Sequence, residues 1–156
     1  MGKTKEEILK EYESEFLDVV RMELEVDGFD EKVVYSTDME VVPEKMHMIL
    51  PEYSTYHLTI YYRVKKRSIK KLHYYHGIKK AGIAIKTRNL DIGDVEPNEG
   101  EALHKAVFEP DTLPGGYFIR GTYPANTIFS EDGKAIFNFD WNIEIAKKDV
   151  KPSIKI

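Results

Sequence analysis

Histidine and acidic side chains are the residues of this chain that could do chemistry, and their spacing indicates no active site. His73 and His76 stand three residues apart in LHYYHGI, a segment whose composition predicts a strand. Side chains three apart on a strand point to opposite faces of the sheet, so the two rings are not expected to share a metal ion. His47, His57 and His104 are scattered, and we expect them at the surface or rim. Nothing selects a catalytic pair among the 27 acidic residues.

Other catalytic signatures are missing from the sequence. It has no glycine-rich phosphate loop and no helix with paired histidines. Because it contains no cysteine, thiolate nucleophiles, disulfides and sulfur metal sites are excluded. We therefore expect no enzyme, no cofactor and no metal site.

The charge of the chain argues against nucleic acid as a partner. The formal net charge is −4, which provides no broad basic field. The one basic run is KKRSIKK, residues 65–71, and we interpret it as a solvated link between strands whose charge guards a sheet edge. Contact with acidic headgroups or a protein is an alternative, as is a nucleic-acid strip completed by Tyr74 and Tyr75.

Size and composition indicate one soluble globular domain. The chain has 156 residues, of which 42% are hydrophobic and 12% aromatic, enough for one core. It has no stretch near the roughly 20 apolar residues of a membrane span and no apolar signal core at its N-terminus. Since the lack of cysteine also suits a reducing compartment, we expect a cytoplasmic monomer.

The sequence TKEEILKEYESEFL predicts a short N-terminal helix. Thr4 can cap its start with Glu7 reaching back, and Ile8, Tyr12 and Phe16 recur at four-residue spacing as an apolar stripe. A helix of about 14 residues is marginal alone in water, so we expect it to dock on the rest of the chain. We treat residues 1–18 as a helical segment that precedes the main domain.

Residues 19–156 predict an antiparallel β-sandwich. The period changes to two after residue 18, and seven to nine short strands follow, with turns at EPNEG, DTLPGG and SEDGK. The strands are expected in residues 20–26, KVVY, MHMIL, YHLTIYYRV, LHYYHGI, AGIAI, ALHKAVF, YFIRGTY and FNFDWNIEI.

The segment FNFDWNIEI alternates, with Phe137, Phe139, Trp141, Ile143 and Ile145 on one face. This pattern is typical of a half-buried strand. Alternation alone leaves open whether this face packs on the core of the protein or on a molecule from outside.

Several segments together resemble the Rho GDP-dissociation inhibitor family. YHLTIYYRV, LHYYHGIKKAGIAI, LPGGYFIRGTY and FSEDGKAIFNFDWNIEIAKK occur in the order and nearly the spacing of that family, over roughly residues 20–148. The resemblance implies an immunoglobulin-like sandwich that binds a prenylated Rho-type GTPase. Such a protein inserts the isoprenoid tail between its sheets, extracts the GTPase from membranes after a transient encounter with their surface, and holds it soluble.

The resemblance also implies which residues line the isoprenoid pocket. The matching positions are Met48, Tyr56, Ile69, Leu72, Phe118, Ala125, Phe139 and Trp141, with Leu24, Ile83, Leu90 and Tyr123 as weaker candidates. Phe139 stands where many members carry a second tryptophan, and Phe137 and Ile145 are assigned to the core. Contacts to the GTPase are implied for Asp111, Glu131 and Asp132.

Family members usually carry several tens of residues before the sandwich, as an arm that grips the GTPase. Here about 18 residues precede the first expected strand, which implies a shortened arm. Two alternatives stay open. One is a general prenyl or lipid carrier that resembles the phosphodiesterase delta subunit and does not inhibit GDP dissociation. The other is an interaction module with a filled core and no cavity beside Trp141.

Overall fold

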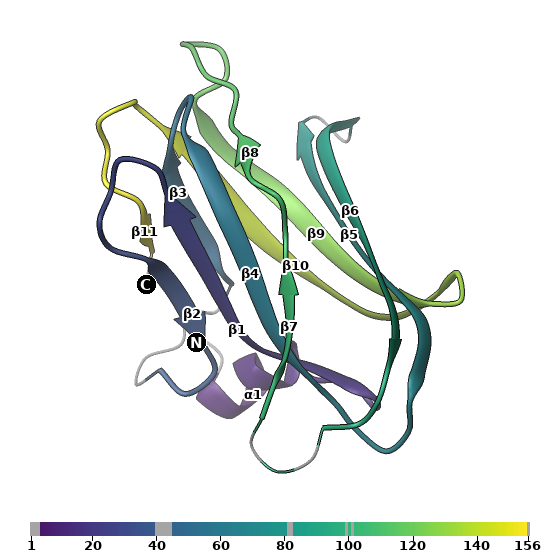
Figure 1. Ribbon diagram of the computed structural model, residues 1–156. Helices are drawn as coiled ribbons and strands as arrows, with labels where there is room; N and C mark the ends of the chain where they lie inside the picture. The colour runs from purple at the N-terminus through teal and green to yellow at the C-terminus, as the bar shows by residue number, and fades with distance from the viewer. Residues whose placement is uncertain (1–3, 40–44, 81–82, 99, 101, 156) are drawn as a thin grey trace.

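Two β-sheets lie face to face in the computed structural model, which describes residues 4–39, 45–80, 83–98, 100 and 102–155 (Figure 1). The first sheet has the order β2-β1-β4-β7, with β8 also paired to β4. Its strands are β1 (Leu17–Val26), β2 (Val33–Ser36), β4 (Thr55–Val64), β7 (His104–Val107) and β8 (Asp111–Thr112).

The second sheet has the order β11-β3-β10-β9-β5-β6. Its strands are β3 (His47–Pro51), β5 (Ile69–Lys80), β6 (Ile83–Val95), β9 (Gly121–Glu131), β10 (Lys134–Ala146) and β11 (Ser153–Ile154). Neighbouring strands run antiparallel except β3 and β10, which are parallel. The predicted all-β sandwich is confirmed, with this one parallel pair as an addition.

Alternating sequence explains why the sheets face each other. Every second residue of β4 is buried along its whole length, and β10 buries Phe137, Phe139, Trp141, Ile143 and Ile145. The side chains between them point to the outer faces. Removing these alternate apolar side chains from water is the main force that holds the layers together.

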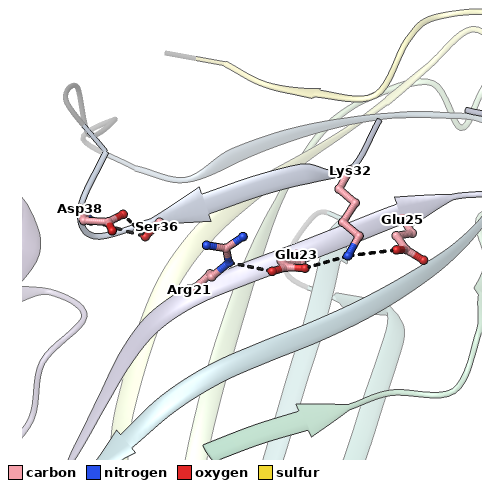
Figure 2. Close-up of polar contacts among 6 residues, drawn as sticks. All are labelled: Arg21, Glu23, Glu25, Lys32, Ser36 and Asp38. Atoms are coloured by element: carbon pink, nitrogen blue, oxygen red, sulfur yellow. Dashed lines mark hydrogen bonds and ion pairs between the residues drawn. The ribbon is translucent and has the colours of Figure 1, made fainter. Parts of the chain in front are cut away.

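The outer face of β1 carries a ladder of charges, which Figure 2 shows. Arg21 Nε lies 2.7 Å from Glu23 Oε2, and Lys32 Nζ lies 3.3 Å from both Glu23 Oε1 and Glu25 Oε1. Lys32 immediately precedes β2, so the ladder ties this edge strand to β1. The outer face here is therefore polar, and its positive and negative charges compensate one another.

The N-terminal helix α1 (Lys5–Lys10) is shorter than the sequence predicted. The predicted cap is confirmed, because the Glu7 N–H donates to Thr4 Oγ1 at 3.2 Å. The chain leaves the helix after Lys10, and Tyr12 enters the core between Tyr35 and Phe139, with ring centroids 5.2 and 5.1 Å away. Ile8 and Tyr12 are buried, so the segment docks on the sandwich as expected.

The short strands β8 and β11 were not predicted, and two further strands differ from the prediction in their bounds. Residues 117–120 form a turn, and β9 begins at Gly121, because Gly116 at φ 106° redirects the chain. The β6 strand continues to Val95, well beyond AGIAI. It is the terminal strand of its sheet and pairs with β5, so it tolerates the polar residues that obscured it in the sequence.

Tyr12 provides a test of this docking. Replacing it by alanine (Tyr12→Ala) should lower the free energy of unfolding by about 3 kcal/mol, because a fully buried ring would leave a cavity. Lys10→Ala, on the last turn of α1, should change it by less than about 0.5 kcal/mol. Urea unfolding followed by circular dichroism measures both variants, and equal losses would contradict the docking role of Tyr12.

Candidate functional site

The interior around Trp141 brings together four of the predicted pocket residues. Ala125 on β9 pairs with Trp141 on one side and with Ile78 of β5 on the other. Met48 of β3 is the register partner of Ile143, the next inward residue of β10. Tyr56 faces them from the opposite sheet, and all four predicted residues are buried.

Little space remains beside Trp141. Side chains of both sheets enclose a cavity of about 10 Å³, room for about one water molecule. Its walls are Met22, Leu24, Met48, Leu50, Tyr56, Leu58, His76, Ile78, Trp141 and Ile143. The interior beside Trp141 is therefore filled by its own side chains.

An open apolar groove adjoins this closed interior. Its volume is about 420 Å³, and it lies where β5 and β6 face β8 and the loop of residues 113–120. Its walls are Ile78, Lys80, Lys86, Thr112, Leu113, Pro114, Ile119 and Ile145. Ile78 lines both the groove and the closed cavity, so the two spaces adjoin at its side chain.

A buried polar network fixes the orientation of Trp141. The indole Nε1–H donates to Thr127 Oγ1 at 2.9 Å. The Tyr74 hydroxyl lies 3.3 Å from Thr127 Oγ1 and 2.8 Å from His76 Nδ1. Among the described residues, His76 Nε2 is buried without a hydrogen-bond partner. His76 is 1% exposed, and this burial lowers its pKa to about 4, so the ring is neutral at pH 7.

The histidine pair behaves as the strand periodicity predicted. His76 is buried, whereas His73 lies on the outer face, with Nδ1 2.5 Å from Asp91 Oδ1 and Nε2 2.8 Å from Asn89 Oδ1. The expectation that the two rings point to opposite faces is confirmed.

The remaining predicted pocket residues lie apart from the Trp141 cluster. Phe139 is buried against Tyr12 and Phe137. Ile69 and Leu72 are buried at the start of β5, six or more residues from Ile78 and so roughly 20 Å along the strand. Phe118 is 83% exposed in the loop beside the groove. A role in lipid binding stays a prediction for each of them.

The weaker candidates are also dispersed. Leu24 lines the cavity beside Trp141, and Tyr123 donates its hydroxyl hydrogen bond to the Ile119 carbonyl at the groove wall. Leu90 is partly buried on β6 opposite Tyr74. The side chain of Ile83 lies outside the described residues.

Asp111 lies at the edge of the groove. Its Oδ2 is 3.1 Å from Lys86 Nζ and 3.8 Å from Arg88 Nε, and it accepts a hydrogen bond from the Tyr56 hydroxyl at 3.2 Å. A candidate contact to the GTPase thus touches a candidate pocket residue. An external cation would have to compete with two internal ones for this carboxylate.

Glu131 and Asp132 differ in accessibility. Glu131 accepts two hydrogen bonds of 2.8 Å from the Arg67 guanidinium and one of 2.8 Å from the Lys70 N–H. These bonds lower the pKa of Glu131 to about 2. Asp132 has 73% of its side chain exposed, and its carboxylate lies 3.6 Å from Lys71 Nζ. Asp132 is therefore the more available acid for an outside partner.

The basic run of residues 65–71 is neutralised within the protein. Each of its five cations pairs with an acid, at distances between 2.8 and 3.9 Å. The pairs are Lys65 with Asp18, Lys66 with Glu15, Arg67 with Glu131, Lys70 with Asp94, and Lys71 with Asp132. This pairing supports the interpretation of residues 65–71 as a solvated link between strands. Along these residues no positive charge is left unpaired for a nucleic acid to bind.

Comparison with known proteins identifies the family. A sequence model of the RHO protein GDP dissociation inhibitor family matches residues 1–148. The chain belongs to the Rho GDP-dissociation inhibitor family. It is 29% identical over 132 residues to the Rho GDP-dissociation inhibitor of Schizosaccharomyces pombe, a match that covers 83% of this chain and 63% of the relative.

Two further relatives carry the same name. The Rho GDP-dissociation inhibitor of Saccharomyces cerevisiae is 33% identical over 101 residues, which cover 64% of this chain and 50% of that protein. Rho GDP-dissociation inhibitor 1 of Arabidopsis thaliana is 28% identical over 107 residues, which cover 68% of this chain and 44% of that protein. The matches thus span between 44% and 63% of the relatives' lengths.

The described part of this Rho GDP-dissociation inhibitor family member lacks two further features. It contains no group of three or more histidine or acidic residues placed to hold a metal ion. It also contains no helix long and apolar enough to cross a membrane.

The sequence interpretation missed most of the groove. Ile78 and His76 could have been found, because alternation along β5 places both on the face of Tyr74. Ile145 is buried in the core, as assigned, and it also lines the groove. Leu113, Pro114 and Ile119 lie in a loop whose path no periodicity predicts.

His76 predicts how stability depends on pH. Because its folded-state pKa is lowered to about 4, the unfolded chain binds a proton more readily, and stability falls as the pH drops from about 6.5 toward 4. Between pH 7 and pH 4.5 the loss from this group should be roughly 2 kcal/mol. His76→Phe should remove that part of the pH dependence. Urea unfolding at both pH values measures it, and an unchanged pH dependence in His76→Phe would contradict the assignment. His73→Phe should change the pH dependence in the opposite direction, because hydrogen bonds with Asn89 and Asp91 raise the pKa of His73 and so stabilise the folded state at low pH.

Proposed function

We propose that this chain binds the prenylated C-terminus of a Rho-family GTPase, extracts the GTPase from membranes and keeps it soluble in the cytoplasm. The observation that carries the proposal is the apolar groove of about 420 Å³ that adjoins Trp141 through Ile78. This volume lies within the range of small-ligand sites. Membership of the Rho GDP-dissociation inhibitor family supports a Rho-type GTPase as the source of the lipid.

The groove is open to solvent on one side, so an isoprenoid that lay in the groove alone would keep part of its surface in water, and full burial requires the interior to open. Each methylene-sized group buried in a bilayer contributes about 0.8 kcal/mol, which gives on the order of 15 kcal/mol for a twenty-carbon tail. The carrier must bury a comparable apolar surface. Met22 and Met48 stand between the sheets beside Trp141, and their unbranched side chains can rearrange at low cost. Entry from the groove past Ile78 would then bring the lipid onto Trp141.

The acidic residues suit a basic segment next to the lipid. Asp111 lies at the groove edge, where residues close to a prenylated terminus would pass. Asp132 lies on the β9–β10 turn, at the far end of β9 from the groove wall (Figure 1). A GTPase that reaches both would extend along the sandwich. Attraction between such charges speeds association more than it strengthens the final complex.

The two alternatives differ in what they require of the structure. The closed space beside Trp141 is what a filled-core interaction module requires, whereas the adjoining open groove is what a lipid carrier requires. Family membership supports the Rho-directed proposal over a general carrier that resembles the phosphodiesterase delta subunit.

Lipid binding can be tested with labelled peptides. A geranylgeranylated or farnesylated peptide should bind with saturable fluorescence anisotropy, and the same peptide without lipid should not. Ala125→Trp should weaken binding at least tenfold, because a large ring would occupy the space between Ile78 and Trp141. Ile119→Trp, on the groove wall, should do the same without overfilling the core.

The matched control is Val107→Trp, which places the same ring on the exposed outer face of β7 and should leave binding unchanged. Circular dichroism checks that each variant is folded. Equal binding of lipidated and unlipidated peptides would overturn the proposal in favour of the filled-core module.

Electrostatic steering can be tested on Asp132. Asp132→Asn should slow association with a prenylated Rho-family GTPase roughly threefold at low salt, with little effect at high salt. Stopped-flow fluorescence measures the rate. Asp30→Asn removes an exposed charge from another turn and serves as the control. If both variants slowed association equally, Asp132 would have no specific contact with the GTPase.

A further inference from the structure

Large exposed apolar side chains gather at one end of the sandwich. In the described part of the chain there are five, and four of them lie in turns beside the groove: Tyr53, Tyr117, Phe118 and Val150, between 38% and 83% exposed. Figure 1 shows that the turns after β3, β8 and β10 lie together at the end near β8. The fifth, Val107, lies on the outer face of β7.

These aromatic side chains are held in place by the backbone. The Tyr53 ring lies over Gly115, where an added Cβ would be 2.7 Å from a ring carbon. Tyr117 and Phe118 pack edge to face, with ring centroids 5.4 Å apart. The Gly116 N–H donates to Glu52 Oε2 at 2.8 Å, which anchors the loop to β3. The contact of Tyr53 with Gly115 and the hydrogen bond from Gly116 to Glu52 thus hold the three exposed rings in a defined arrangement at the surface.

Uncompensated positive charges surround the same end. Lys79 and Lys80 end β5, and Lys147 and Lys148 follow β10. None of these four makes an ion pair with another described residue, whereas every cation of the 65–71 run does. The exposed acid in the 147–150 turn is Asp149 alone. The β1–β2 turn at the same end carries the acids Asp27, Asp30 and Glu31, of which Asp27 contacts His57 and Glu31 pairs with Lys151. The four lysines still have no ion-pair partner among the described residues, although the net charge of the chain is −4.

We propose that this aromatic end, defined by Tyr53, Tyr117, Phe118, Val150 and the four lysines, docks on the surface of a bilayer that contains anionic lipids. Tyrosine suits the membrane interface because its ring is apolar and its hydroxyl is polar. Lysines near the surface are attracted to anionic headgroups. Lysine is depleted in protein interfaces, so this composition favours a membrane over a protein partner.

The position of the groove agrees with this docking. Ile119 and Ile145 both line the groove. The 113–120 loop, which contains Ile119, carries the exposed rings of Tyr117 and Phe118, and the 147–150 turn just after Ile145 carries two of the lysines and Val150. A lipid tail could then pass from the bilayer into the groove with little exposure to water. This inference rests on the proposed function for its purpose, although bilayer docking can be measured separately.

The test uses the full chain and vesicles of phosphatidylcholine with or without phosphatidylserine, measured by co-sedimentation. Binding is expected to need phosphatidylserine and to fall with salt. The double variants Tyr53→Ser/Tyr117→Ser and Lys147→Gln/Lys148→Gln should each weaken it on the order of tenfold. Val107→Ser and Lys105→Gln, two exposed changes on β7, should leave it unchanged.

Several outcomes would overturn the inference. They are equal binding with and without phosphatidylserine, equal losses in the β7 controls, and no vesicle binding by the unaltered chain. If the unaltered chain bound no vesicles and the double variants captured less GTPase than it did, this end would be a contact surface for the GTPase and not for a membrane. Circular dichroism and thermal melting show whether each variant is folded.

Binding of the lipidated peptide without vesicles separates this inference from the proposed function. If the chain binds vesicles but no lipidated peptide, the proposed function fails and the docking surface stands. If it binds the peptide and not the vesicles, the docking surface fails and the proposed function stands.

Discussion

Apolar side chains between two sheets have to be shielded from water at both ends of the sandwich, and the two ends of this protein meet that requirement differently. Near α1, Tyr12 enters between Tyr35 and Phe139 and closes the interior with aromatic contacts. Near β8, the 113–120 loop stands away from the strands and leaves an open groove walled by Ile78, Ile119 and Ile145. The difference follows from what covers each end, since the strands themselves alternate in the same way throughout.

Local sequence patterns predicted the elements that depend on burial of one face. The β4 and β10 strands were found because alternation and burial coincide along their whole length. The β6 strand was found only in part, because a terminal strand does not need an apolar face. Residues 117–120 were predicted as a strand from their apolar composition, but Gly116 at positive φ turns the chain there. Composition alone does not reveal such a turn.

The resemblance to the Rho GDP-dissociation inhibitor family implied the pocket residues, and the alternation of the strands explains why four of them meet. Trp141, Ala125, Met48 and Tyr56 converge because each points inward from a neighbouring strand. Which buried residues lie next to open space depends on contacts between distant segments. Phe139 has the same pattern as Trp141, yet Tyr12, more than a hundred residues away in sequence, occupies the volume beside it. A pattern within one strand carries no information about that contact.

The closed interior beside Trp141 has a consequence for how the proposed carrier would work. Opening it requires side chains of both sheets to separate, while the Trp141–Thr127 hydrogen bond keeps the indole in position. Part of the free energy gained by burying a lipid would therefore be offset by this rearrangement. A carrier that exchanges its cargo with membranes needs an affinity close to that of the bilayer, because a much tighter pocket would not release the lipid. Rearrangement of the side chains around Trp141 would supply such an offset, and the open groove gives the lipid a place to begin.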